Sequence, residues 1–155
     1  MTSPTAPLRD CVLLQVPVRL WARTQEQTDA LIRELALVAA GGNDHETPRR
    51  LTNLIAALEA CFGGATTNQE EQLFAAVEDG VEVIEELRFQ LPVAAGPASR
   101  ELGVMLDEAD DFCAQGKHLL TLAAGPEVVA LRRWWLEQLA SQLEGAPPVP
   151  WPAGA

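Results

Sequence analysis

The stretch PASRELGVMLDEADDFCAQG, residues 97–116, has the most regular helical pattern in the chain. Its apolar side chains recur three or four positions apart or as neighbours, which places them on one side of an α-helix. They are Leu102, Met105, Leu106, Ala109, Phe112 and Cys113. Pro97 suits the first turn of a helix, and Gly116 suits the position just after its end. We therefore predict a helix over 97–116 that packs against the core.

A second helix is expected over residues 126–144, PEVVALRRWWLEQLASQLE. Its apolar stripe consists of Val128, Leu131, Trp135, Leu136, Leu139 and Leu143. Adjacent residues of a helix point about 100° apart, so Trp134 and Trp135 cannot lie on one face. One indole therefore packs in the core, and the other lies at its edge or outside, beside Arg132 and Arg133. The pattern leaves open which of the two is exposed.

Two segments upstream alternate apolar and polar residues as half-buried strands do. In residues 12–20 we expect Val12, Leu14, Val16, Val18 and Leu20 to face one way. Pro17 indicates a position at the edge of a sheet. The second strand covers residues 83–91. Parallel and antiparallel pairing both stay open, and residues 118–122 form either a third strand or a helical turn.

Three further helices are expected between the strands, over residues 24–40, 47–62 and 67–80. Thr24 with Gln27 has the spacing of a capping box. The fold class is therefore α+β and mainly helical, with about five helices packed on a two- or three-stranded sheet. We expect a single domain over residues 1–155, with a flexible N-terminus at 1–9 and an extended proline-rich tail at 146–155.

Composition excludes several classes of partner. The net charge of −11 opposes binding to nucleic acid and to anionic membrane surfaces. The apolar runs are far shorter than the about 20 residues that span a bilayer, and the first ten residues lack the pattern of a secretory signal. The three cysteines form no CxxC pair, and their number is odd. We expect them to be buried free thiols of a cytoplasmic protein.

No stretch has the spacing of a catalytic, cofactor-binding or metal-binding motif. The acidic run Asp107-Glu108-Ala109-Asp110-Asp111 is the nearest approach to a metal site, and we expect a solvated helix face instead. The two histidines, His45 and His118, lack the spacing of a zinc hydrolase. The paired arginines 49–50 and 132–133 either bind a carboxylate or phosphate or lie on the solvent side of their helices. We therefore predict neither a metal nor a cofactor.

Several segments resemble a bacterial protein family. Leu13–Trp21 followed by Ala22-Arg23-Thr24 belongs to this resemblance, as do 31–37 (LIRELAL), 106–111 (LDEADD), 119–123 (LLTLA) and 126–134 (PEVVALRRW). Together they cover most of the chain and resemble small proteins of high-GC bacteria that accompany partner-switching signalling modules. Such a module contains an anti-sigma-factor kinase, a STAS-domain antagonist and a PP2C-type phosphatase. The family has no assigned activity, so the resemblance transfers no catalytic residue. The chain also lacks the asparagine-bearing helix and the DxGxG loop of the kinase.

The leading hypothesis is a cytoplasmic, non-enzymatic protein-interaction module that regulates bacterial signalling, with homodimerisation left open. Aromatic and arginine side chains are the groups that most often dominate protein interfaces. The predicted partner-binding residues are Arg19, Trp21, Arg132, Arg133, Trp134 and Trp135. The alternative is a small-ligand sensor with a pocket between the helices and the sheet, and an uncharacterised enzyme is the third hypothesis. A sensor requires an apolar cavity with a few convergent polar groups, whereas an interaction module requires an exposed aromatic patch.

Overall fold

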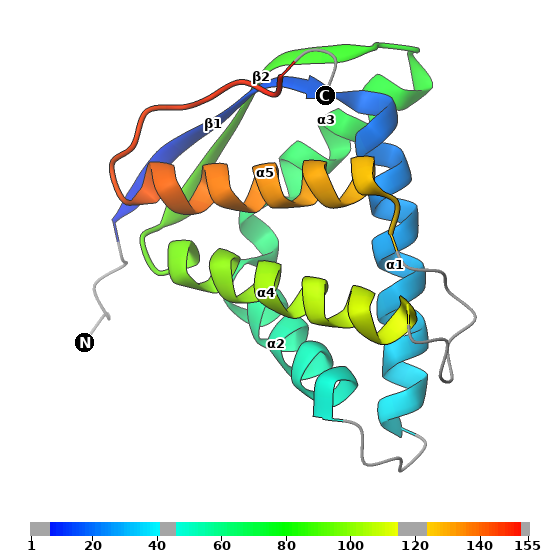
Figure 1. Ribbon diagram of the computed structural model, residues 1–155. Coiled ribbons are helices and arrows are strands. Elements are labelled where there is room, and N and C mark those ends of the chain that lie inside the picture. Colours follow the sequence, from blue (N-terminus) through cyan, green and yellow to red (C-terminus); the bar gives the residue numbers. More distant parts are fainter. Residues whose placement is uncertain (1–6, 41–45, 115–123, 153–155) are drawn as a thin grey trace.

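A computed structural model describes residues 7–40, 46–114 and 124–152 (Figure 1). Five α-helices and two β-strands lie within these ranges. In chain order they are β1 (Leu8–Pro17), α1 (Val18–Ala40), α2 (Glu46–Phe62), a 3-10 turn (Gly63–Ala65), α3 (Thr67–Glu78), β2 (Val83–Pro92), α4 (Ala95–Ala114) and α5 (Pro126–Leu143). The predicted fold class, mainly helical α+β, is confirmed.

The two strands pair antiparallel along their whole length, from Leu8 opposite Pro92 to Pro17 opposite Val83. This settles the direction that the sequence left open. The strand predicted over 83–91 is confirmed to within one residue. The segment 118–122, expected as a third strand or a helical turn, lies outside the described residues.

The first strand differs from the prediction in position and in the face that it buries. It ends at Pro17, and Val18 already begins α1, so Trp21 belongs to a helix. The predicted alternation is wrong for its first half, because Cys11 and Leu13 are buried instead of their neighbours. Gln15 has a φ of 60°, and this turn of the backbone exchanges the two faces, so that Val16 is again buried. Alternation alone cannot reveal such a local rotation.

The predicted capping box at Thr24 is also wrong, because α1 begins six residues earlier, at Val18. At this start of the helix, the backbone amide of Val18 donates a hydrogen bond to the carbonyl of Glu82 at 3.0 Å. Thr24 lies inside the helix, and its hydroxyl donates to the carbonyl of Leu20 at 2.8 Å. This is the bond that a threonine makes within a helix rather than at its start.

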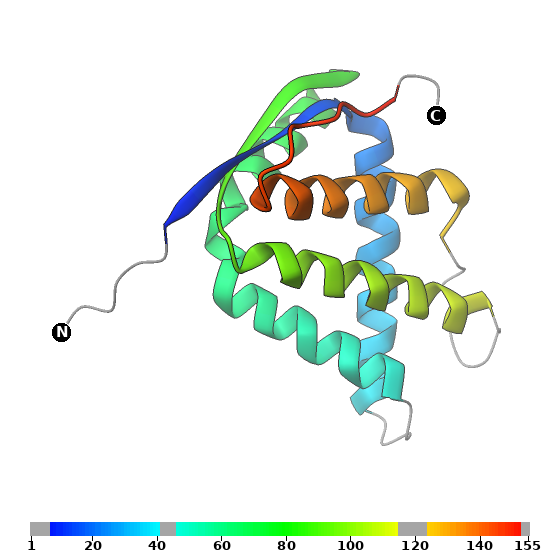
Figure 2. The same ribbon diagram turned by 60° about the vertical axis from the view of Figure 1, so that its left-hand side comes forward.

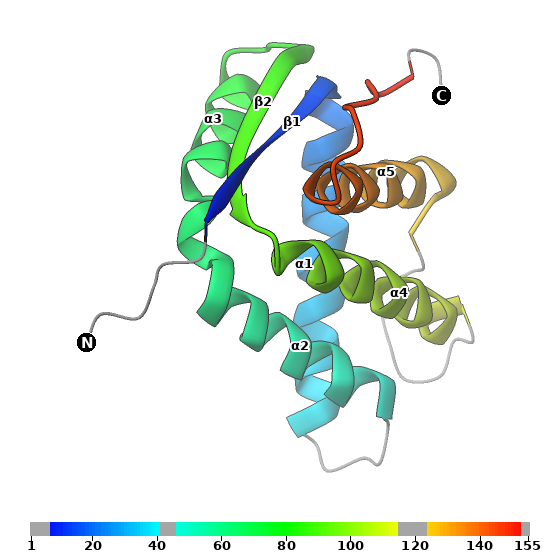
Figure 3. The same ribbon diagram turned by 90° about the vertical axis from the view of Figure 1, so that its left-hand side faces the viewer.

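The helices form a stack crossed by one long helix (Figure 1). In that view α5, α4 and α2 lie one above another, and α1 runs across all three. Figure 2 shows the same stack from a second direction. The strand pair covers one end of the molecule, with α5 beside β1 and α3 beside β2 (Figure 3). The architecture therefore places α5 between the sheet and α4.

Buried apolar side chains form two separate clusters. The first packs beneath the sheet and includes Leu13, Leu87 and Phe89 together with Leu131 and Leu143 of α5. The second joins α1, α2 and α4, and it consists of Leu31, Leu35, Leu51, Met105, Leu106 and Ala109. Of the stripe predicted for the helix over 97–116, Met105, Leu106 and Ala109 belong to this second cluster and Leu102 packs against it, whereas the side chains of Phe112 and Cys113 lie outside the described part. The two clusters face each other across α5 and α4.

A side-chain amide joins the sheet to α5. Gln142 accepts a hydrogen bond from the amide of Val12 through Oε1, and its Nε2 donates to the carbonyl of Val12, both at 2.8 Å. The same Nε2 donates to Oε1 of Gln138 at 3.1 Å. Gln142 thus satisfies the free edge of β1 as a neighbouring strand would.

The C-terminal tail, predicted over 146–155, continues this seam, and its described residues 146–152 are in neither helix nor strand. The amide of Trp151 donates to the carbonyl of Leu14 at 3.0 Å, two residues along β1 from Val12. The amide of Val149 donates to Oε1 of Gln138 at 2.8 Å. The tail therefore covers the β1 edge that α5 leaves open.

Replacement of Gln142 by methionine tests this seam. Gln142→Met keeps the length of the side chain but leaves the amide and carbonyl of Val12 without a partner. We expect the free energy of unfolding to fall by about 2–4 kcal/mol, the cost of two part-buried polar groups without hydrogen bonds. Urea unfolding measures this change, and Gln72→Met on the exposed side of α3 is the matched control. Equal midpoints for the two variants would show that the seam contributes nothing.

Candidate functional site

A cleft lies between the two apolar clusters. It consists of two adjoining hollows of about 220 and 320 Å³, both partly open to solvent. They share lining residues from α1, α4 and α5, so they lie side by side, and together they are called the cleft. The larger is within the range of roughly 300–1,000 Å³ typical of small-molecule sites. The apolar residues of the first hollow are Trp21, Leu73, Phe89, Leu102, Leu106, Leu131, Trp135, Leu136 and Leu139.

Arg132 lies in the wall of the first hollow, and its side chain is only 4% exposed. Its Nη2 donates to Oδ1 of Asp107 at 2.8 Å and to Oδ2 of Asp110 at 2.6 Å. The aspartates are three positions apart on α4, so they share the face that packs against α5. Within the described part of the chain, Nε and Nη1 of Arg132 are buried and have no hydrogen-bond partner. A buried arginine thus offers two unused donors beside the cleft.

Groups that accept hydrogen bonds line the side of the cleft formed by α3. Nε2 of Gln69 donates to the carbonyl of Arg88 at 2.7 Å, which fixes the orientation of its amide. Its Oε1 is buried and has no partner within the described ranges. The next residue, Glu70, has a raised pKa, mainly because of burial and further because of the nearby carboxylates of Glu59 and Asp29. These two carboxylates line the second hollow.

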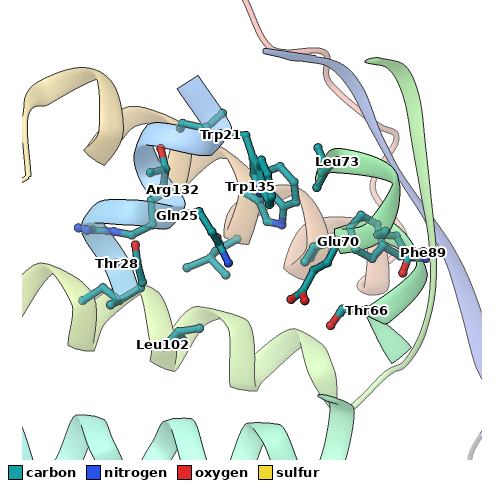
Figure 4. A pocket seen from close by; sticks show the side chains of 16 residues that line it. Trp21, Gln25, Thr28, Thr66, Glu70, Leu73, Phe89, Leu102, Arg132 and Trp135 are labelled. Atoms are coloured by element: carbon teal, nitrogen blue, oxygen red, sulfur yellow. The ribbon is translucent and has the colours of Figure 1, made fainter. Parts of the chain in front are cut away.

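The cleft is therefore polarised along its length. Figure 4 shows Arg132 and Thr28 toward one end and Glu70 and Thr66 toward the other, with Trp135 between them. Hydrogen-bond donors lie at the first end, and acceptors and negative charge lie at the second. The middle is apolar and aromatic. Such a surface binds a molecule with complementary ends.

Three of the six predicted partner-binding residues meet in this cleft. Trp21, Arg132 and Trp135 all line the first hollow. Trp21 is buried and packs edge-on against Phe74, with 5.1 Å between the ring centroids. Trp135 is half-buried and meets Phe89 in the same way at 6.2 Å. The structure thus places these residues in a concave site and not on a convex surface patch.

The other three residues lie outside the cleft. Arg19 is exposed in the first turn of α1, and Arg133 is exposed beside Asp107, 3.2 Å from its carboxylate. Trp134 is half-buried under the tail, where its Nε1 donates to the carbonyl of Val149 at 3.0 Å and its ring packs on Trp151. Trp134 and Trp135 are both half-buried against the cluster beneath the sheet, with 6.5 Å between their ring centroids, so neither is exposed.

The sequence reasoning missed the polar residues of the cleft. Thr24 and Thr28 stand two turns and one turn before Leu31 on the inner side of α1, so a threonine within an apolar stripe was a detectable signal. Gln69 and Glu70 carry no such signal, because α3 has a weak apolar pattern. The solvated acidic face expected on α4 is corrected in part, since Asp107 and Asp110 bind Arg132. The sequence left two alternatives for Arg132, a solvent-facing position or the binding of a carboxylate or phosphate. Its burial excludes the solvent-facing position.

Other kinds of site find little support in the described residues. Within them, no three histidine, cysteine or acidic side chains come together as metal ligands. Burial, with a further contribution from Asp10, raises the pKa of the Cys11 thiol and so disfavours its reactive thiolate form. His45 and His118 lie outside the described ranges. No helix in those ranges is both long enough and apolar enough to cross a membrane.

Comparison with known proteins adds no relative. No protein-family model matches the chain, and neither the curated proteins nor the solved structures contain a significant match. The resemblance to proteins that accompany partner-switching modules therefore stays a prediction. The geometry and chemistry of the cleft are therefore the basis for assigning a function.

The carboxylates at the cleft provide a test of its electrostatics. Because the folded-state pKa of Glu70 is raised, ionisation of this residue destabilises the fold at neutral pH. We expect Glu70→Gln to raise the free energy of unfolding at pH 7 by roughly 0.5 kcal/mol, the size of an interaction between solvent-screened charges. The gain should vanish below about pH 4, where the carboxyl is protonated in both states.

Chemical unfolding at several pH values measures the effect, and Glu71→Gln, one residue further along α3, is the control. A gain that is equal for both variants, or that persists at acid pH, would contradict the assigned proximity of Glu70 to Glu59 and Asp29.

Proposed function

We propose that the protein is a non-enzymatic sensor domain that binds a small amphiphilic molecule in the cleft. The observation that carries this proposal is an apolar, aromatic cleft whose wall contains Arg132 and Gln69, two side chains with buried polar atoms that have no partner in the described chain. Pockets with a few convergent polar groups in an apolar wall are the usual form of a small-molecule site. Unused buried donors and acceptors are unfavourable in an empty protein, and a ligand removes that cost.

A binding role fits the polar groups better than a catalytic one. Two of the three threonines in the first hollow already donate to backbone carbonyls, Thr24 to Leu20 and Thr66 to Gly63. A nucleophile requires a positioned base within hydrogen-bond reach. Among the described lining residues, no hydroxyl is bonded to a basic side chain. The cleft therefore supports recognition.

The first hypothesis, a cytoplasmic protein-interaction module in bacterial signalling, stays a second proposal. It rested on an exposed patch of aromatic and arginine side chains. Two of its six residues, Trp21 and Arg132, are buried in this structure. A role in signalling is compatible with the sensor, because a bound ligand can change which surface a partner contacts. The cleft is the more direct starting point for experiments.

A neutral fluorescent probe tests the sensor proposal. N-phenyl-1-naphthylamine is apolar, and its fluorescence rises on transfer from water to an apolar site. We expect saturable one-to-one binding to the wild-type protein. Thr28→Phe places a larger side chain in the wall shared by both hollows and should raise the dissociation constant by about tenfold or more.

Thr67→Phe is the matched control, because Thr67 is exposed and does not line the cleft. Circular dichroism and unfolding midpoints verify that both variants fold. Undiminished binding to a folded Thr28→Phe variant would refute the cleft as the binding site.

A further inference from the structure

The cleft of the proposed sensor has two chemically different ends, and these restrict the ligand. At the α5 end, Nε and Nη1 of Arg132 are donors without an acceptor in the described chain. Arginine cannot lose its charge in a protein, so these donors persist at every physiological pH. Each of these atoms exposes less than 1 Å², so a ligand oxygen bonds them once the Arg132 side chain shifts toward the cleft. This end therefore selects a hydrogen-bond acceptor.

The charge around Arg132 decides which acceptor is favoured. Its guanidinium already faces Asp107 and Asp110, at 2.8 and 2.6 Å. The two negative charges of these carboxylates exceed the single positive charge of Arg132. Arg133 supplies a second positive charge, but only on the outer side of Asp107. A further anion would meet no uncompensated positive charge. A neutral carbonyl or amide oxygen fits this end better than a carboxylate does.

The α3 end has the opposite character. Oε1 of Gln69 is a buried acceptor without a donor in the described ranges, and Glu70 follows it. The carboxylates of Glu59 and Asp29 add negative charge at the adjoining hollow. Within the described residues, no salt bridge neutralises any of these three carboxylates. An ammonium group supplies both the donor and the positive charge.

We propose that the cleft binds an amine whose apolar or aromatic body carries a neutral carbonyl oxygen at the opposite end. The ammonium lies at Gln69 and Glu70, and the body packs against Trp135. The carbonyl accepts from Arg132. This order follows the arrangement in Figure 4, where Trp135 lies between Arg132 and Glu70. The inference rests on the proposed sensor function, and it adds the chemical class of the ligand.

A matched series of benzene derivatives separates the two ends. The compound 4-(2-aminoethyl)benzamide carries both groups, 4-ethylbenzamide lacks the ammonium, and 2-phenylethylamine lacks the carbonyl. Chemical-shift titration of the labelled protein measures each dissociation constant. We expect the first compound to bind about tenfold more tightly than either truncated one, the usual effect of one charge-assisted hydrogen bond. The acid 4-(2-aminoethyl)benzoate should bind more weakly than the amide.

Two pairs of variants assign each end to a residue. Glu70→Gln should weaken the aminoethyl compounds and leave 4-ethylbenzamide unchanged, while the control Glu71→Gln affects neither. Arg132→Lys keeps a cation for Asp107 and Asp110 but lacks the two unused donors. It should weaken both amides and leave 2-phenylethylamine unchanged. Arg133→Lys is its exposed control.

Each outcome bears on one proposal. Equal binding of all three compounds, or equal effects of Glu70→Gln and Glu71→Gln, would overturn the proposed ligand class. Absence of binding by the whole series, with the naphthylamine still bound in the cleft, would also overturn it and leave the sensor proposal standing. Loss of the naphthylamine site itself refutes the sensor proposal. If Arg132→Lys fails to fold, the Glu70 pair and the compound series still decide the question.

Discussion

The pair of hydrogen bonds between Gln142 and the backbone of Val12 is the constraint on which the rest of the structure depends. Two strands alone are marginally stable in water, and β1 would otherwise expose an unpaired edge. The glutamine amide occupies that edge with one donor and one acceptor, both at 2.8 Å. Because it also bonds Gln138, which holds the tail at Val149, one helix face fixes the strand and the C-terminal segment together.

This attachment determines where the cleft lies. The C-terminal half of α5 is tied to the sheet by Gln142, and its N-terminal half is tied to α4 by Arg132 through Asp107 and Asp110. Between these two attachments α5 packs against both apolar clusters, with Leu131 and Leu143 in the first and Leu136 against the second. The space between them is lined by side chains from both, such as Phe89 and Leu106. The same arginine therefore bonds α4 through one nitrogen, while its other two guanidinium nitrogens are buried without a partner in the described chain.

The sequence predicted the second strand and four of the five described helices to within two residues, because their apolar residues recur with a regular period, but it placed the start of α1 six residues too late. It failed at β1, where the positive φ of Gln15 exchanges the buried face and no residue type announces it. The candidate site was predicted in part, since Trp21, Arg132 and Trp135 do come together. Their concave arrangement depends on the packing of α5 between distant elements, and a linear pattern holds no information on that packing. The contact of Gln142 with β1 was not predicted, because a glutamine on a helix normally faces solvent.

The central claim is that the cleft, and not the convex surface of α5, is the place where a ligand binds. The four tryptophans divide between these places, with Trp21 and Trp135 in the cleft and Trp134 beneath the tail, against Trp151 of the tail itself. The most direct measurement is the nitrogen–proton spectrum of the indole groups, assigned with single Trp→Phe variants and recorded with and without 4-(2-aminoethyl)benzamide. The account predicts that the signals of Trp21 and Trp135 move while that of Trp151 stays in place. Shifts confined to Trp134 and Trp151 would contradict it.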